Sequence, residues 1–100
     1  MAVYSEVVTA DQRLRVLQML EADPDRTHNA DVLRAGLEAS GHRGVTYRRV
    51  RDLLDWLASE GLAALEDRGA VTLARLTERG EDVALGGSAV PGVARPRKGF

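Results

Sequence analysis

The sequence predicts a small α+β domain, mainly helical with one β-hairpin, in the order helix, helix, helix, strand, strand, helix. Three segments before residue 61 carry apolar residues at the three- and four-residue spacing of amphipathic helices. Around Asp67-Arg68-Gly69 the spacing shifts toward two, which is typical of a hairpin, and a capped helical segment follows Thr77. The chain has 100 residues, of which 44% are hydrophobic, so we expect a single core.

The first expected helix covers about residues 10–22, with an earlier start left open. The apolar residues that follow helical spacing there are Val7, Ala10, Leu14, Leu17 and Leu20. Thr9 followed by Gln12 fits a capping box that would begin this helix. Asp23-Pro24 closes it, because proline disfavours helical backbone in the residue before it.

Two more helices are expected on either side of a turn at residues 42–45. The second begins after Asn29, whose side chain can cap it, and ends near Ser40-Gly41. The third begins after Thr46 and ends before Gly61, since glycine suits the position just past a helix. The apolar stripe of this third helix consists of Val50, Leu53, Leu54 and Leu57.

A β-hairpin and a short last helix are expected after Gly61. The segments LAALE and AVTLARL alternate in part between apolar and polar residues. Thr77 then caps a helix over about residues 77–86, which Gly80 keeps short. Residues 87–100 contain two prolines and three cations without apolar periodicity. We therefore expect one domain over residues 1–86 and a flexible basic tail over residues 87–100.

The composition argues against several classes of function. The absence of cysteine excludes disulfides and thiolate chemistry, and His28 and His42 are too far apart to form a local ligand pair, so we expect no metal and no cofactor. No G-x-S-x-G, glycine-rich phosphate loop or H-E-x-x-H motif occurs, so we expect no enzyme. Without a signal peptide or an apolar run of membrane-spanning length, the expected location is the cytoplasm, with no membrane association.

The charge is distributed unevenly along the chain. The net charge is −1, yet residues 43–51 hold four arginines and no acidic residue. Residues 87–100 hold three further cations, whereas the remaining segments are acidic. Because local fields rather than net charge decide where a polyanion docks, the start of the third helix is the candidate contact for nucleic acid.

Two motifs carry a resemblance to a known family. They are VRDLLDWLASEGL at residues 50–62 and ARLTERGEDVA at residues 74–84. With the order of elements, they resemble winged helix-turn-helix proteins of the ArsR-like, MarR-like and PadR-like kind over residues 10–86. Together with the VPGV segment at residues 90–93, the chain is more narrowly similar to small winged-helix proteins of Mu-like prophages. It lacks the cysteines of metal-sensing ArsR-like members and is shorter than MarR-like dimers, so no small-molecule effector is expected.

The resemblance implies that the third helix is a recognition helix, whose first turns enter the major groove of double-stranded DNA. Arg48, Arg49 and Arg51 are then expected in the groove, where arginine can form two hydrogen bonds with guanine. The residues expected to contact DNA beside them are Arg43, Thr46, Tyr47 and Arg68. The expected role is that of a phage or bacterial transcriptional regulator, with specific or general DNA binding.

A protein-interaction adaptor without DNA binding is the alternative function. Separately, the structural alternative for Arg48 and Arg51 is that each forms a surface ion pair with the aspartate four residues further on, on a solvated helix face. The candidate interface residues, for an adaptor or a homodimer, are Val8, Val16, Met19 and Trp56. Trp56 packing beneath the hairpin or the last helix is the structural alternative. The tail cations, Arg95, Arg97 and Lys98, either grip phosphate without sequence preference or aid solubility.

Overall fold

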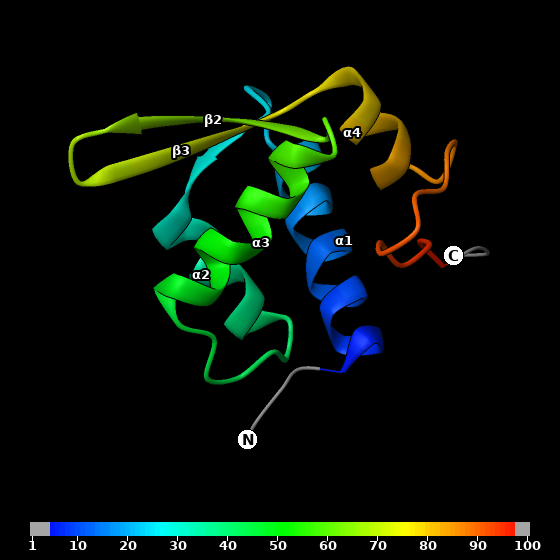
Figure 1. Cartoon of the computed structure of the whole chain (residues 1–100), viewed down its shortest axis with the longest axis horizontal. Helices are drawn as coiled ribbons and strands as arrows, with labels where there is room; N and C mark the ends of the chain where they lie inside the picture. The colour runs from blue at the N-terminus through cyan, green and yellow to red at the C-terminus, as the bar shows by residue number, and fades with distance from the viewer. Residues whose placement is uncertain (1–4, 98–100) are drawn as a thin grey trace.

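Four helices and a three-stranded antiparallel sheet make up residues 5–97, the part of the chain that the computed structural model describes (Figure 1). In chain order they are α1 (Glu6–Ala22), β1 (Thr27–Asn29), α2 (Ala30–Ala39), α3 (Tyr47–Ser59), β2 (Ala63–Arg68), β3 (Val71–Leu76) and α4 (Glu78–Ala84). The α+β class and the predicted order are confirmed, with one additional strand, β1.

The helices begin at side chains that cap their first amide groups. Asn29, Thr46 and Thr77 each accept a hydrogen bond from the backbone amide three residues on, at 2.8 to 3.0 Å, as the sequence predicts. The capping box expected at Thr9 and Gln12 was wrong, and α1 has the earlier start that the sequence left open. Ser5 caps this helix by accepting from the amide of Val8 at 3.1 Å, and the helix continues through the region of the expected capping box.

The sheet consists of the predicted hairpin and a short strand that pairs with it. β3 lies in the centre, with β2 on one side and β1 on the other. In β1, Thr27 lies opposite Arg75 and Asn29 lies opposite Leu73. A strand of three residues has no alternating pattern to read, so it escaped prediction.

The core fills the space between the sheet and the helices α1, α2 and α3, which Figure 1 shows together on one side of the sheet. The largest of its fully buried hydrophobic side chains are Leu17, Leu20, Leu33, Leu37, Leu53, Leu54, Leu57 and Leu62. The apolar stripe predicted for α3 is confirmed, because all four of its residues are at most 1% exposed. Burial of this stripe fixes which face of α3 points outward.

Gly80 lets α4 approach the start of β2. A Cβ atom at this position would lie 2.0 Å from the carbonyl oxygen of Leu62 and 2.7 Å from Cδ1 of Leu76. Thr77 strengthens the same junction, because its hydroxyl donates to the carbonyl of Gly61 at 2.8 Å. The glycine that the sequence suggested would shorten the helix is therefore required by packing.

The segment after α4 is packed on the domain, so the predicted flexible tail was wrong for residues 87–97. Val90 and Val93 are only 6% and 8% exposed and belong to the core. The amide of Ala94 donates to the carbonyl of Ala10 at 3.1 Å, which attaches the segment to α1. Two valines in a turn produce no periodicity, so the sequence pattern did not reveal their burial. Lys98, the last of the tail cations, lies outside the described residues.

Candidate nucleic-acid interface

The first turn of α3 and the turn before it present exposed polar side chains. Arg43, Thr46 and Arg48 are all exposed, and the buried stripe of α3 points away from them. Within residues 5–97, the side chains of Arg43 and Arg48 make no hydrogen bond and no ion pair. Thr46 accepts from the amide of Arg49, and its hydroxyl keeps a hydrogen to donate. These residues lie at the N-terminal end of α3 and in the turn before it. They form a small basic surface, which we call the α3 end.

Arg49 does not belong to this surface, and its predicted contact in a DNA groove requires its hydrogen bonds with α1 to break. Its Nε donates to Oε1 of Gln12 at 3.0 Å, and its Nη2 donates to Oγ1 of Thr9 at 2.8 Å. Gln12 is only 1% exposed, so its amide oxygen needs a donor from within the protein. Arg49 therefore fastens α3 to α1.

Arg51 turns toward the hairpin, so its predicted contact in a DNA groove requires its bonds with α3 and the hairpin to break. Its Nε donates to Asp55 at 3.1 Å, which confirms the alternative of an ion pair on the helix surface. Its Nη1 also donates to Oδ1 of Asp67 at 3.0 Å and to Oγ1 of Thr72 at 3.1 Å. The same guanidinium thus contacts one carboxylate of α3 and two side chains of the hairpin.

A hydrogen-bond network extends this link between α3 and the hairpin. The buried hydroxyl of Thr72 donates to Asp67 at 2.7 Å and accepts from the hydroxyl of Tyr47 at 3.4 Å. The Thr72 hydroxyl, together with Arg51, holds the pKa of Asp67 below its usual value. Hydrogen bonds with Asp67 and Asp55 raise the pKa of Arg51. Tyr47, predicted as a DNA contact, is 40% exposed and braces the hairpin.

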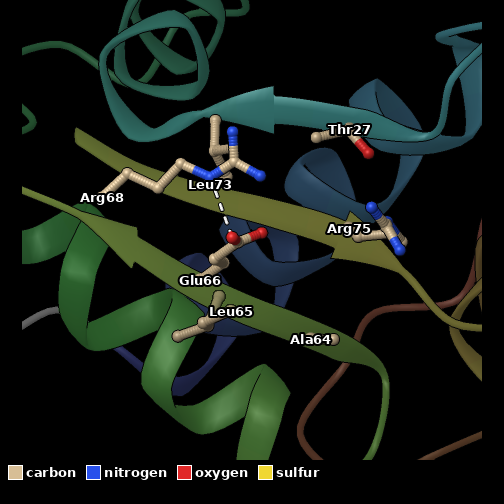
Figure 2. Close-up of a pocket in the computed structure, with 7 residues that line it drawn as sticks. All are labelled: Thr27, Ala64, Leu65, Glu66, Arg68, Leu73 and Arg75. Atoms are coloured by element: carbon tan, nitrogen blue, oxygen red, sulfur yellow. Dashed lines mark hydrogen bonds and ion pairs between the residues drawn. The ribbon is translucent and has the colours of Figure 1, made fainter.

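Arg68 lies on the outer face of the sheet. Figure 2 shows its guanidinium pairing with Glu66. Its Nε donates to Oε2 of Glu66 at 2.8 Å, and both residues line a cavity of about 340 Å³. This ion pair lowers the pKa of Glu66 and raises that of Arg68. Arg75 lines the other end of the same cavity. Because Arg68 already faces a carboxylate, its predicted contact with DNA requires that pair to open.

Most of the four candidate interface residues are buried or packed against other parts of the chain. Val16 is 0% exposed, so its prediction as a surface residue was wrong. Met19 packs closely on α2, where its Sδ would lie 2.1 Å from a Cβ atom added to Gly36. Val8 is half-buried on α1. A homodimer stays a prediction.

Trp56 packs against α1 and the segment after α4. The guanidinium of Arg13 stacks on its ring, 3.7 Å from the centroid, and donates to the carbonyl of Gly92 at 3.0 Å. A Cβ atom on Gly92, whose φ is 97°, would lie 2.9 Å from the ring. The sequence suggested cover by the hairpin or the last helix, whereas Arg13 of α1 and Gly92 of the tail lie against the ring.

The described part of the chain contains neither a metal-binding cluster nor a membrane-spanning helix. Residues 5–97 contain no group of three or more histidines and carboxylates arranged to hold a metal ion. Over the same residues, no helix combines the length and the apolar character that crossing a membrane requires. Sequence reasoning missed the side chains that anchor Arg49 and Arg51 of α3, which are Thr9, Gln12, Asp67 and Thr72.

Comparisons with known proteins reveal relatives in a phage and in a bacterium. The chain is 39% identical over 93 residues to the uncharacterized protein gp26 of Escherichia phage Mu, covering 93% of this chain and 95% of gp26. It is 36% identical over 78 residues to an uncharacterized protein of Haemophilus influenzae, covering 76% of this chain and 74% of that protein. No family model and no solved structure matches the chain.

Proposed function

We propose that this chain, which belongs to the same family as the uncharacterized protein gp26 of phage Mu, binds double-stranded DNA as a winged helix. Helices α2 and α3, joined by the turn at residues 40–46, have the order of a helix-turn-helix unit, and the β2–β3 hairpin follows in the position of a wing. α3 is then the recognition helix. The role that fits a phage relative is that of a transcriptional regulator.

The observation that carries this proposal is the exposed, unpaired state of Arg43 and Arg48 at the α3 end, within the described chain. Two guanidiniums without an internal carboxylate can bind phosphate or guanine without first breaking an ion pair. The free amides at the start of α3 add a field that favours anions. Both features lie at the N-terminal end of α3, the part of a recognition helix that enters the major groove.

The remaining arginines of α3 serve to position this surface. Arg49 holds α3 on α1, and Arg51 holds the hairpin on α3. A recognition helix and wing that are fixed before binding lose less conformational entropy on the DNA. Asp52 and Asp55 are exposed further along α3 and would repel phosphates. We therefore restrict the proposed contact to the first turn of α3, with its preceding turn.

The observations favour this function over a protein adaptor. Val16, Met19 and Trp56, three of the four residues on which an adaptor surface would depend, are used in contacts within the chain. An adaptor would therefore need a different surface.

A salt titration with matched variants tests the proposal. A fluorescent duplex of mixed sequence is titrated with the full chain at several salt concentrations, and the logarithm of the binding constant is plotted against the logarithm of salt. Each phosphate neutralised contributes about −0.9 to the slope. Removal of both cations in Arg43→Gln/Arg48→Gln should therefore make the slope shallower by about 1.8 and weaken binding at low salt.

The control variant, Arg75→Gln/Arg79→Gln, removes the same charge from exposed positions on the sheet and on α4. It should bind like the unaltered chain. Absence of binding at low salt overturns the proposal, and so does an equal loss in both variants, because that would mean a response to overall charge only.

A further inference from the structure

A second basic surface, separate from the α3 end, lies between α1 and the ordered tail. It is a cleft of about 300 Å³, lined by Arg15 and Gln18 of α1 and by Arg95 and Arg97 of the tail, with Asp11 at its border. Figure 1 shows the tail running beside α1. We call this hollow the tail cleft.

The tail cleft gathers three guanidiniums around a single carboxylate. Arg15 lies 3.6 Å from Asp11, and both groups are partly exposed. Arg95 uses one amino group to donate to the carbonyl of Gly86 at 3.3 Å, which leaves its other donors free. The side chain of Arg97 has no hydrogen bond or ion pair within residues 5–97. This excess of positive charge, in a chain with a net charge of −1, favours an anionic ligand.

The backbone that carries Arg95 and Arg97 is held in place. Val93, immediately before, is buried in the core, and the amide of Ala94 donates to α1. Pro96 separates the two arginines and restricts the backbone between them. The cations are therefore presented at a fixed place on the surface, and binding an anion does not require a long segment to become ordered.

The tail cleft borders the α3 end. Nε2 of His42 lies 2.7 Å from Oδ2 of Asp11, and Arg43 is the next residue along the chain. A carboxylate that lines the cleft is thus in contact with the turn that precedes α3. A duplex that contacts the α3 end also carries phosphates further along its length, one per strand about every 3.4 Å.

We propose that the tail cleft binds backbone phosphates of the same duplex, outside the groove that α3 enters. The inference rests on the proposed function. Arg95 and Arg97 supply contacts that ignore base sequence, and they lengthen the stretch of DNA that the protein covers. The longest dimension of the domain, 39 Å, corresponds to about 11 base pairs of duplex.

The test compares Arg95→Gln/Arg97→Gln with Arg75→Gln/Arg79→Gln and with the unaltered chain on a duplex of about 25 base pairs, long enough for the whole domain. Loss of two phosphate contacts should make the salt slope about 1.8 shallower. Between about 50 and about 200 mM salt, the tail variant should then lose about 12-fold less affinity than the unaltered chain. Its base preference should not change, and circular dichroism should show the same fold.

The outcomes separate this inference from the function on which it rests. If the unaltered chain does not bind DNA, the proposed function fails and the inference fails with it. If DNA binds but the tail variant keeps the original slope, only the inference is overturned. A poly-glutamate peptide serves as the other probe: if it shifts the NMR signals of Arg95 and Arg97 while the duplex leaves them unchanged, the tail cleft belongs to an acidic protein partner.

Discussion

Truncation of Val93 to alanine tests whether the segment after α4 is part of the folded domain. Val93 is 8% exposed, so the two methyl groups that Val93→Ala removes are almost entirely buried. At about 0.8 kcal/mol per buried carbon, their transfer accounts for about 1.6 kcal/mol. The cavity left behind raises the cost, so we expect the free energy of unfolding to fall by about 2 kcal/mol.

Chemical denaturation, followed by circular dichroism, measures this difference directly. The midpoint should fall while the denaturant dependence stays constant, since the same surface is exposed on unfolding. In a thermal scan, a loss of 2 kcal/mol corresponds to a decrease of about 8–16 °C for a domain of this size.

Val7→Ala is the matched control, because it removes the same atoms from a side chain that is 79% exposed. Its effect should stay within about 0.5 kcal/mol. Equal stability of the two variants would refute the packing of the tail, and the preformed tail cleft would lose its basis.

Two further predictions concern α4 and the hairpin. Gly80→Ala improves helix propensity by about 1 kcal/mol but forces a Cβ atom against the carbonyl of Leu62, so denaturation should show a net loss of about 1–3 kcal/mol; a gain would contradict the close approach. Asp67 should titrate below the ordinary aspartate pKa of about 3.9 in an NMR experiment, because the Thr72 hydroxyl and Arg51 favour its charged form. A lowered folded-state pKa stabilises the protein above the ordinary pKa, and this contribution is lost as the pH falls through the lowered value. Asp67→Asn should reduce the acid sensitivity of the hairpin, measured by amide exchange, and a normal pKa for Asp67 would argue against the network.

Local signals predicted most of the helical structure. Capping by Asn29, Thr46 and Thr77 depends on residues within one turn, so these starts were correct. Gly61, with a φ of 75°, ends α3 for an equally local reason. β1 was missed because a strand of three residues is defined by its pairing with β3, and 48 residues separate the paired Thr27 and Arg75.

The arginines of α3 show where local reasoning fails. A basic block predicts positive charge near the start of the helix, but the direction of each side chain depends on distant partners. Arg49 bonds to Gln12, 37 residues earlier, and Arg51 bonds to Asp67, 16 residues later. Such polar contacts leave no periodic pattern in the sequence. The tail was missed for a related reason, since Val90 and Val93 are buried in the core and Ala94 is hydrogen-bonded to Ala10, which is 84 residues earlier.

The most direct measurement is an NMR titration of the full chain with duplex DNA, in which the arginine Nε–H signals are assigned individually. The account predicts that the signals of Arg43 and Arg48 shift on binding, while those of Arg49 and Arg51 remain near their free positions, because their hydrogen bonds to Gln12 and Asp67 persist. A titration that leaves Arg48 unchanged, or that shifts Arg49 and Arg51 instead, would contradict the proposed recognition surface.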